Sequence, residues 1–253
     1  MPPPPPSRSA SAACVAGWRR IAHGVETLRD AREVPRHRHL DAYATVVLDG
    51  AYEQLAYAGR LRVRAGDVLV APTLDCHADR MRSSGARILR LPWPRCADLG
   101  GAYRPDGLDT VIRAAARDAH EASALLMAAI AGTPSRPAAR DDWEDLLAAA
   151  LRTRGGLRIG DWAAAHGLAR ETVTRGFARA YGVAPARFAA ELRAREAWLR
   201  ATGSAEPLAK IAADLGYADQ PHMTHAVRRL TGAPPARWRG TSHSCKTAAA
   251  PAA

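Results

Sequence analysis

The sequence predicts an α+β protein in which an N-terminal antiparallel β-barrel precedes an all-α domain with two helix-turn-helix units. Two observations lead to this fold class. From about Val25 to Leu91 the chain contains short runs of β-forming residues separated by turns. From Leu157 to Arg239 it is rich in helix formers, and it repeats its own pattern after about 50 residues. Such a repeat indicates one supersecondary unit that is built twice.

The length and the changes in composition indicate how the chain is divided. With 253 residues, the chain can form two domains that each bury a core. The expected segments are a disordered N-terminus at 1–20, a barrel domain at 21–107, a helical linker or dimerisation segment at 108–132, a flexible linker at 133–140, a helical domain at 141–240 and a disordered tail at 241–253.

The charge and the cysteines narrow the class of protein. A formal net charge of +11 favours a polyanionic partner. No apolar run approaches the roughly 20 residues that a membrane helix needs, and the first residues lack the apolar region of a secretory signal. The four cysteines show no C-x-x-C spacing, so we expect reduced thiols in a cytoplasmic protein without a membrane partner.

Turn signals divide the β-rich stretch at regular intervals. The run from Ala42 to Leu48 leads into Asp49-Gly50, a hairpin signal, after which Ala51 to Tyr57 returns. Further turns are expected at the following places: Ala58 to Arg60, Ala65 to Asp67, and Ser83 to Gly85. This spacing suits a small barrel or sandwich.

Three histidines within this stretch form a candidate metal site. His37 and His39 stand two residues apart on an expected strand, so they point to one face, and His77 follows from a later strand. Three imidazoles are a common donor set for a divalent metal. The arrangement resembles the cupin fold, in which an H-x-H pair and a later histidine meet inside a barrel.

The metal-binding cupins usually add a glutamate a few residues after the H-x-H pair, where this chain has Tyr43 or Ala44. Glu53, Asp41 or a water molecule could serve as the fourth ligand, whereas Cys76 should face the other way. The alternative is that the three histidines only line a pocket or are satisfied core groups. No cofactor other than this possible divalent metal is expected.

Between the barrel and the helical domain, apolar residues recur at helical spacing. They are Leu108, Val111, Ile112, Ala115, Ala119, Leu126 and Ile130. This pattern fits either a helix that covers the core or a dimer seam. Thr133 to Arg140 then forms the flexible linker. We expect Asp141 to cap a helix whose packed residues are Trp143, Leu146, Leu147 and Leu151.

Each copy of the repeat contains Ala-x-x-x-Gly, at Ala163 to Gly167 and at Ala212 to Gly216. The alanine lets a second helix cross closely, and the glycine tolerates the positive φ of a tight turn. The second helix of each copy, here called a reading helix, is expected at about 169–180 and from about Pro221 onwards. The expected inner residues are Val173, Phe177 and Ala180, and then Met223, Val227 and Leu230.

The outer faces of the reading helices carry long polar side chains suited to the major groove. We expect base contacts from Arg170, Glu171, Thr174, Arg175, Gln220, His222, Thr224, His225 and Arg228, and phosphate contacts from Arg179 and Arg229. Residues 155–240 carry thirteen basic and seven acidic side chains, a net charge of +6, which favours DNA by counterion release.

Residues 185–202 lie between the two copies and favour one continuous helix that Gly203 ends. Such a helix is about 27 Å long. That length is comparable with the roughly 34 Å between successive major-groove segments on one face of DNA. A stiff spacer of this length could therefore place both reading helices on the same side of a duplex.

At about 141–239 the sequence resembles the AraC family of bacterial transcription regulators. The carrying residues are the two Ala-x-x-x-Gly turns, Arg175 with Phe177, Gly182 with Pro185, the run from Gly216 to Gln220, and the run from Thr231 to Pro235. The chain departs from the family pattern at Ala169, Gly176, Pro221, Met223, His225 and Val227. The resemblance implies a subunit that binds two adjacent major-groove segments, commonly as a dimer.

We therefore expect a non-enzymatic, sequence-specific transcription regulator that a small molecule or metal in the barrel controls. Its expected partners are double-stranded DNA, the transcription machinery and a second copy of the chain in a homodimer. Two alternatives remain open at this point. One is a metal-dependent cupin enzyme with an attached DNA-binding domain, and the other is an architectural DNA binder that senses nothing.

Overall fold

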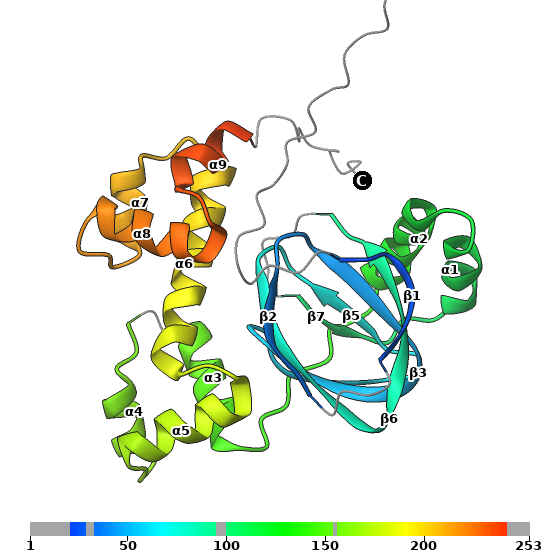
Figure 1. Ribbon diagram of the computed structural model, residues 1–253, viewed down its shortest axis with the longest axis horizontal. Coiled ribbons are helices and arrows are strands. Elements are labelled where there is room, and N and C mark those ends of the chain that lie inside the picture. The colour runs from blue at the N-terminus through cyan, green and yellow to red at the C-terminus, as the bar shows by residue number, and fades with distance from the viewer. Residues whose placement is uncertain (1–20, 29–32, 95–99, 154–155, 242–253) are drawn as a thin grey trace, which may run out of the picture.

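The computed structural model describes residues 21–28, 33–94, 100–153 and 156–241. Within these ranges, seven strands precede nine helices along the chain (Figure 1). We call the region of β1 to β7 the sheet domain and the region of α3 to α9 the helical domain. The expected disordered ends, at 1–20 and 241–253, fall outside the described residues except for Thr241. No helix in the described part is long and apolar enough to cross a bilayer.

The strands form one antiparallel sheet that curves strongly (Figure 1). The seven strands are β1 (Gly24–Leu28), β2 (Glu33–His39), β3 (Tyr43–Ala56), β4 (Gly59–Arg64), β5 (Val68–Ala71), β6 (Asp75–Pro92) and β7 (Gly101–Tyr103). The order is β1-β6-β3-β5-β7, with β2 also beside β6 and β4 also beside β3. No pairing among the described strands joins β1 to β7, so this sheet is open. The mixed fold class is confirmed, but the closed cupin barrel is not.

The hairpin expected at Asp49-Gly50 is wrong, because β3 runs straight through these residues. The register between β3 and β6 shifts there, and Gly50 adopts a φ of 77°. A Cβ on Gly50 would lie 2.2 Å from the carbonyl oxygen of Gly85, the glycine of the third expected turn, which also lies within a strand. The two glycines thus mark an irregularity at which the long strands bend. The turns near Gly59 and Gly66 separate β3 from β4 and β4 from β5 as expected.

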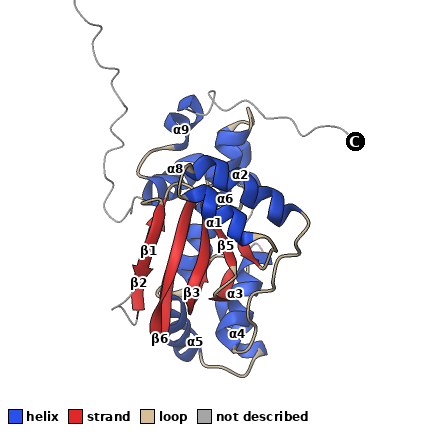
Figure 2. Cartoon of the chain, turned by 90° about the vertical axis from the view of Figure 1, so that its right-hand side faces the viewer, coloured by secondary structure: helices blue, strands red, loops and turns tan. Residues whose placement is uncertain are grey.

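Helices α1 (Leu108–Ala115) and α2 (Ala119–Ala131) lie on the side of the sheet away from α6 (Figures 1 and 2). Val111 and Leu126 are buried in one cluster with Val46 and Val68 of the sheet. Of the two interpretations of this segment, the structure therefore supports a helix pair that covers the core. The use of the segment as a dimer seam stays a prediction.

The segment at 133–140 runs along the sheet rather than away from it. The backbone N–H of Arg136 donates to Ala102 O at 2.7 Å, and that of Ala139 donates to Arg60 O at 2.9 Å. The Arg136 guanidinium also pairs with the buried Asp67 at 2.7 Å. The expected flexible linker is thus attached to the sheet domain by three polar contacts.

The helical domain follows the expected order closely. Its helices are α3 (Trp143–Thr153), α4 (Ile159–Ala165), α5 (Arg170–Tyr181), α6 (Pro185–Gly203), α7 (Leu208–Asp214), α8 (Gln220–Thr231) and α9 (Pro235–Thr241). The turns after α4 and α7 contain Gly167 at φ 65° and Gly216 at φ 69°, as predicted. The reading helices are α5 and α8, and the spacer is the single helix α6.

Two details at the start of the helical domain differ from the prediction. Leu146 of α3 is 41% exposed, whereas Leu147 and Leu151 are buried as expected. The carboxylate of Asp141, expected as a helix cap, instead accepts a hydrogen bond from Arg62 of the sheet domain. This partner lies on a distant strand, and the local sequence pattern carries no signal for such a contact.

The two domains do not have wholly separate cores. One buried cluster joins side chains of the helical domain to Leu55, Tyr57, Leu74 and Cys76 of the sheet domain. The Tyr57 ring packs against Phe188 of α6 with 5.6 Å between centroids. Burial of apolar area therefore stabilises the contact between the domains as well as each domain.

Packing explains why the chain departs from the AraC-family pattern at Gly176. A Cβ at this position of α5 would lie 2.5 Å from the Trp143 ring of α3. The Trp143 ring in turn lies 6.3 Å from the Trp162 ring of α4, so it cannot move away without disturbing α4. A large apolar residue is excluded here because α3 crosses α5 at this glycine.

We predict that Gly176→Ala lowers the free energy of unfolding by about 1 to 3 kcal/mol, because the methyl group overpacks the contact with Trp143. Helix propensity alone would favour alanine by about 1 kcal/mol. The measurement is urea unfolding. The matched control is Gly160→Ala in α4, where an added Cβ meets nothing within 4 Å. Equal or greater stability of Gly176→Ala than of the parent would contradict this account of the crossing.

Candidate DNA-binding surface and histidine cluster

The reading helices expose the side chains that the sequence analysis singled out. Ten of the expected contact residues are exposed, and Thr224 is half-buried; the exposed ones are Arg170, Glu171, Thr174, Arg175, Arg179, Gln220, His222, His225, Arg228 and Arg229. The inner residues Val173, Phe177, Met223 and Val227 are fully buried. The faces are therefore as predicted, while the individual contacts with DNA stay predictions.

The two reading helices begin differently. The side chain of Asp219 accepts a hydrogen bond of 2.7 Å from the backbone N–H of His222, so Asp219 caps α8. Ala169 precedes α5 and offers no side-chain cap. The cap of α8 thus lies two residues before Pro221, and the first copy of the repeat has no equivalent.

The basic surface of the helical domain is smaller than the count of charges suggests. Arg195 is buried and donates to Thr73 O of the sheet domain at 2.9 Å. Arg200 and Lys210 form ion pairs with Glu206 and Asp214 at 2.6 to 3.0 Å. These three cations serve structural contacts, so the arginines of α5 and α8 provide much of the charge that can meet a phosphate backbone.

Three arginines of the sheet domain contact the C-terminal ends of both reading helices. Arg36 donates to the carbonyl oxygen of Tyr181 at the end of α5, and Arg80 donates to that of Arg179. Arg38 donates to the carbonyl oxygen of Arg229 in α8. The last carbonyls of a helix lack partners within the helix and carry partial negative charge, so cationic donors suit them.

Between these contacts lies Glu191 of α6, a buried carboxylate that sequence reasoning did not single out. It accepts from Arg36 at 3.0 Å, from Arg38 at 2.8 Å and from Arg187 at 3.1 Å. The hydroxyl of Tyr57 also donates to it at 3.3 Å. Burial acts to raise the pKa of Glu191, but the charges of Arg36 and Arg38 outweigh burial and lower the pKa.

The three histidines do meet in the sheet domain. His37 lies directly opposite His77 in the pairing of β2 with β6, and all three side chains are buried. One ring nitrogen from each of His37, His39 and His77 lies within 4.8 Å of the others. A buried set of three imidazoles fits the donor chemistry of a divalent metal such as Zn²⁺. We call these residues the histidine cluster.

The carboxylates beside the histidine cluster are not the ones expected. The carboxylate of Glu53 pairs with Arg62 at 2.9 Å, and Asp41 is exposed. Instead, Asp75 lies 2.6 Å from His77 Nδ1, and Asp79 lies 3.6 Å from His77 Nε2. Both are spaced by two residues from His77 along β6, so the alternation of a strand could have indicated them.

A carboxylate on Nδ1 orients a metal-binding imidazole and leaves Nε2 as the ligand atom. The same contacts also suit a charged histidine without metal. Burial opposes a charge on His77, but the carboxylates of Asp79 and Asp75 outweigh burial and raise its pKa. The geometry therefore fits both alternatives of the sequence analysis, a metal site and a satisfied buried cluster.

Alternation along β2 connects the histidine cluster to the helical domain. His37 and His39 face the cluster, whereas Arg36 and Arg38 face Glu191 and the reading helices. Cys76 of β6 also faces the helical domain, as expected from its place beside His77. A single strand thus touches the candidate effector site with one face and the candidate DNA-binding domain with the other.

Comparison with known proteins supports a helix-turn-helix fold in the helical domain. Residues 162–241 match a family model described as a helix-turn-helix domain. No curated protein matches the chain. The C-terminal part of this chain therefore contains a helix-turn-helix domain, which is found in proteins that bind DNA.

Three of the solved structures that match this chain are the following. An AraC-type regulator from Chromobacterium violaceum is 23% identical, with 35% of this chain and 79% of that chain covered and a TM-score of 0.33. The DNA-binding domain of AdpA in complex with a target DNA is 23% identical, with 40% and 93% covered and a TM-score of 0.37. Fatty-acid-bound ToxT from Vibrio cholerae is 10% identical, with 86% and 94% covered and a TM-score of 0.36. With TM-scores this low, the three structures give no information about the function of this chain.

Proposed function

We propose that this protein is a sequence-specific, non-enzymatic DNA-binding transcription regulator of the AraC type. The observation that carries the proposal is the pair of reading helices, α5 and α8, which expose long polar side chains and bury a continuous apolar face. Each helix follows a shorter helix through a tight glycine turn, which supports the proposal that α4–α5 and α7–α8 act as two helix-turn-helix units.

Helix α6 sets the distance between the two units. Its 19 residues make a rod of about 28 Å, close to the roughly 34 Å between successive major-groove segments on one face of a duplex. Its middle is fixed to the sheet domain by Glu191, and the sheet domain also contacts the C-terminal end of each reading helix. One subunit can therefore present both helices to DNA at a fixed spacing.

The sheet domain supplies the control in this proposal. A divalent metal or small ligand at the histidine cluster would shift β2, which contacts both reading helices and α6 through Arg36 and Arg38. A ligand shifts an equilibrium only by the difference in its affinity for the two states. Here the difference arises because β2 carries both the histidines that would bind the effector and the arginines that contact the helices.

The first test is selection of bound sequences from a random DNA pool, followed by affinity measurements with variants. We predict a site with two specified segments about one helical turn apart for each subunit.

Arg175→Ala should weaken binding by about 1 to 3 kcal/mol and relax one base position, if the guanidinium binds guanine. Arg179→Ala should instead weaken binding to all sequences and reduce the salt dependence.

The control for the DNA measurements is Arg117→Ala, which removes an exposed arginine between α1 and α2 and should leave affinity unchanged. A uniform loss across all sequences for Arg175→Ala would show that this side chain touches only the DNA backbone. Failure of the selection to enrich any sequence would overturn the proposal of sequence-specific binding.

The second test is metal binding by the purified full chain in equilibrium dialysis against Zn²⁺. We predict about one equivalent per chain, with affinity reduced about 10-fold or more in His37→Ala and in His77→Ala, because loss of one ligand leaves the coordination incomplete. His120→Ala, an exposed histidine of α2, is the control and should bind as the parent does. If the parent binds no Zn²⁺, the histidine cluster is a buried ionic core group and the effector binds elsewhere.

A further inference from the structure

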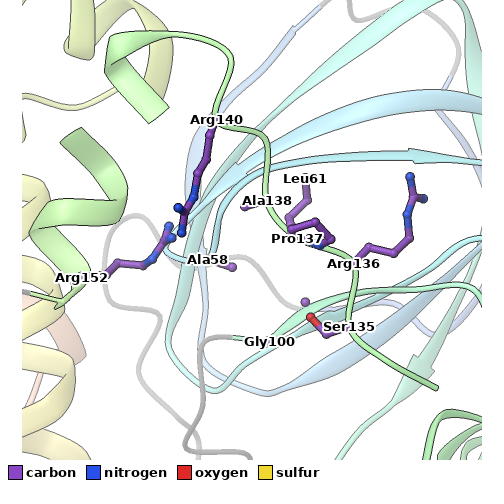
Figure 3. A pocket seen from close by; sticks show the side chains of 10 residues that line it. Ala58, Leu61, Gly100, Ser135, Arg136, Pro137, Ala138, Arg140 and Arg152 are labelled. Carbon is purple, nitrogen blue, oxygen red and sulfur yellow. The ribbon is translucent and has the colours of Figure 1, made fainter. Parts of the chain in front are cut away.

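We propose that a pocket at the junction of the two domains binds a compact organic carboxylate. The pocket has a volume of about 490 Å³, within the usual range of small-molecule sites. It lies where the segment 133–140 passes from the sheet to α3 (Figure 3). Its polar end is formed by Arg140 and Arg152 and its walls by Ala58, Leu61, Pro137 and Ala138.

The two arginines approach each other from different elements. Figure 3 shows the side chains of Arg140, at the end of the segment 133–140, and Arg152, in α3, pointing toward one another. Arg152 is held in place because its Nη1 donates to Tyr57 O at 3.3 Å. A Cβ on Gly59 would lie 2.9 Å from the same nitrogen, so the glycine leaves room for the guanidinium.

The nearby carboxylates are engaged by other arginines. Asp142 and Asp145 pair with Arg60 at 3.3 and 3.1 Å, and Asp141 pairs with Arg62. In the part of the chain that the structure describes, no ion pair joins a carboxylate to Arg140 or Arg152. Two guanidinium groups therefore face each other, and neither is paired with a carboxylate of the described residues.

The positive charges of Arg140 and Arg152 repel each other. Burial lowers the pKa of Arg152, and the positive charge of Arg140 adds to this effect, while Tyr181 and Asp145 offset it only in part. An anion placed between the two guanidinium groups would remove the repulsion and gain two charge-assisted hydrogen-bonding partners. The site is thus suited to a negatively charged ligand.

The remaining walls define the class of anion. A guanidinium fork binds either carboxylate or phosphate oxygens in a bidentate manner. Beyond the two arginines, the apolar side chains of Ala58, Leu61, Pro137 and Ala138 line the pocket together with Ser135 and the glycines 100 and 101. The side chain of Arg136 is directed away from the pair and bound to Asp67 (Figure 3). A ligand with one carboxylate and a compact apolar body would use both parts of the pocket, whereas an inorganic anion would use only one.

A ligand at this place would touch both domains. Ala58 and Leu61 belong to the sheet domain, whereas Arg152 belongs to the first helix of the helical domain. Occupancy would therefore strengthen the contact between the domains and alter the affinity for DNA. This last effect rests on the proposed function, but binding of the anion itself does not.

The experiment is calorimetric titration of the full chain with benzoate, with neutral benzamide and with inorganic phosphate. We expect benzoate to bind one to one with a dissociation constant of about 1 mM or tighter. Arg140→Gln and Arg152→Gln should each weaken benzoate binding about 10-fold or more. Arg117→Gln, an exposed arginine outside the pocket, should leave it unchanged. Because Arg140 is exposed, its variant tests the proposal even if Arg152→Gln fails to fold.

Each outcome decides the proposal. Benzoate binding that depends on both arginines, with benzamide and phosphate at least 10-fold weaker, supports it. Equal binding of phosphate and benzoate overturns the assignment to an organic carboxylate, and no binding, or binding insensitive to Arg140→Gln, overturns the site. A separate measurement of DNA affinity with and without benzoate tests the regulatory step, so failure of the DNA proposal would leave the anion result standing.

Discussion

Glu191 is the one buried carboxylate through which the sheet domain is fixed to the middle of α6, among the residues that the structure describes. Removing a carboxylate from water costs several kcal/mol, so its burial requires cationic and hydroxyl partners. Arg36, Arg38 and Arg187 provide the charge, and Tyr57 provides the hydroxyl. Because two of these arginines come from β2 and also contact the ends of α5 and α8, the orientation of both reading helices depends on this interaction.

Successive side chains of β2 point alternately to the helical domain and to the histidine cluster, and this alternation connects the two. Its even-numbered residues Arg36 and Arg38 belong to the contact with the helical domain, and its odd-numbered residues His37 and His39 belong to the histidine cluster. A movement of the β2 backbone would therefore displace both sets of side chains. The junction pocket offers a second point at which a ligand would touch both domains, so the fold brings two candidate effector sites to one interface.

The local sequence was sufficient to predict most helices of the helical domain. Hydrophobic periodicity and the two glycine turns placed α4 to α8, because helix formation depends mainly on contacts between near neighbours. Three partners of Glu191 could not be found in this way, because Arg36, Arg38 and Tyr57 lie more than 130 residues away along the chain. The prediction of a hairpin turn at Asp49-Gly50 was wrong for a related reason. A turn-forming pair was placed inside a long strand by the neighbouring strand β6.

The most direct test of this account is the unfolding of Glu191→Gln in urea as a function of pH, with the exposed Glu196→Gln as control. Because the folded pKa of Glu191 is lowered below its usual 4.5, its stabilising effect is fully present above that value and is lost as the pH falls through the folded pKa. We expect Glu191→Gln to be about 3 kcal/mol less stable than the parent at neutral pH and the difference to shrink in acid. A Glu191→Gln protein as stable as the control at every pH would contradict the central role of this carboxylate.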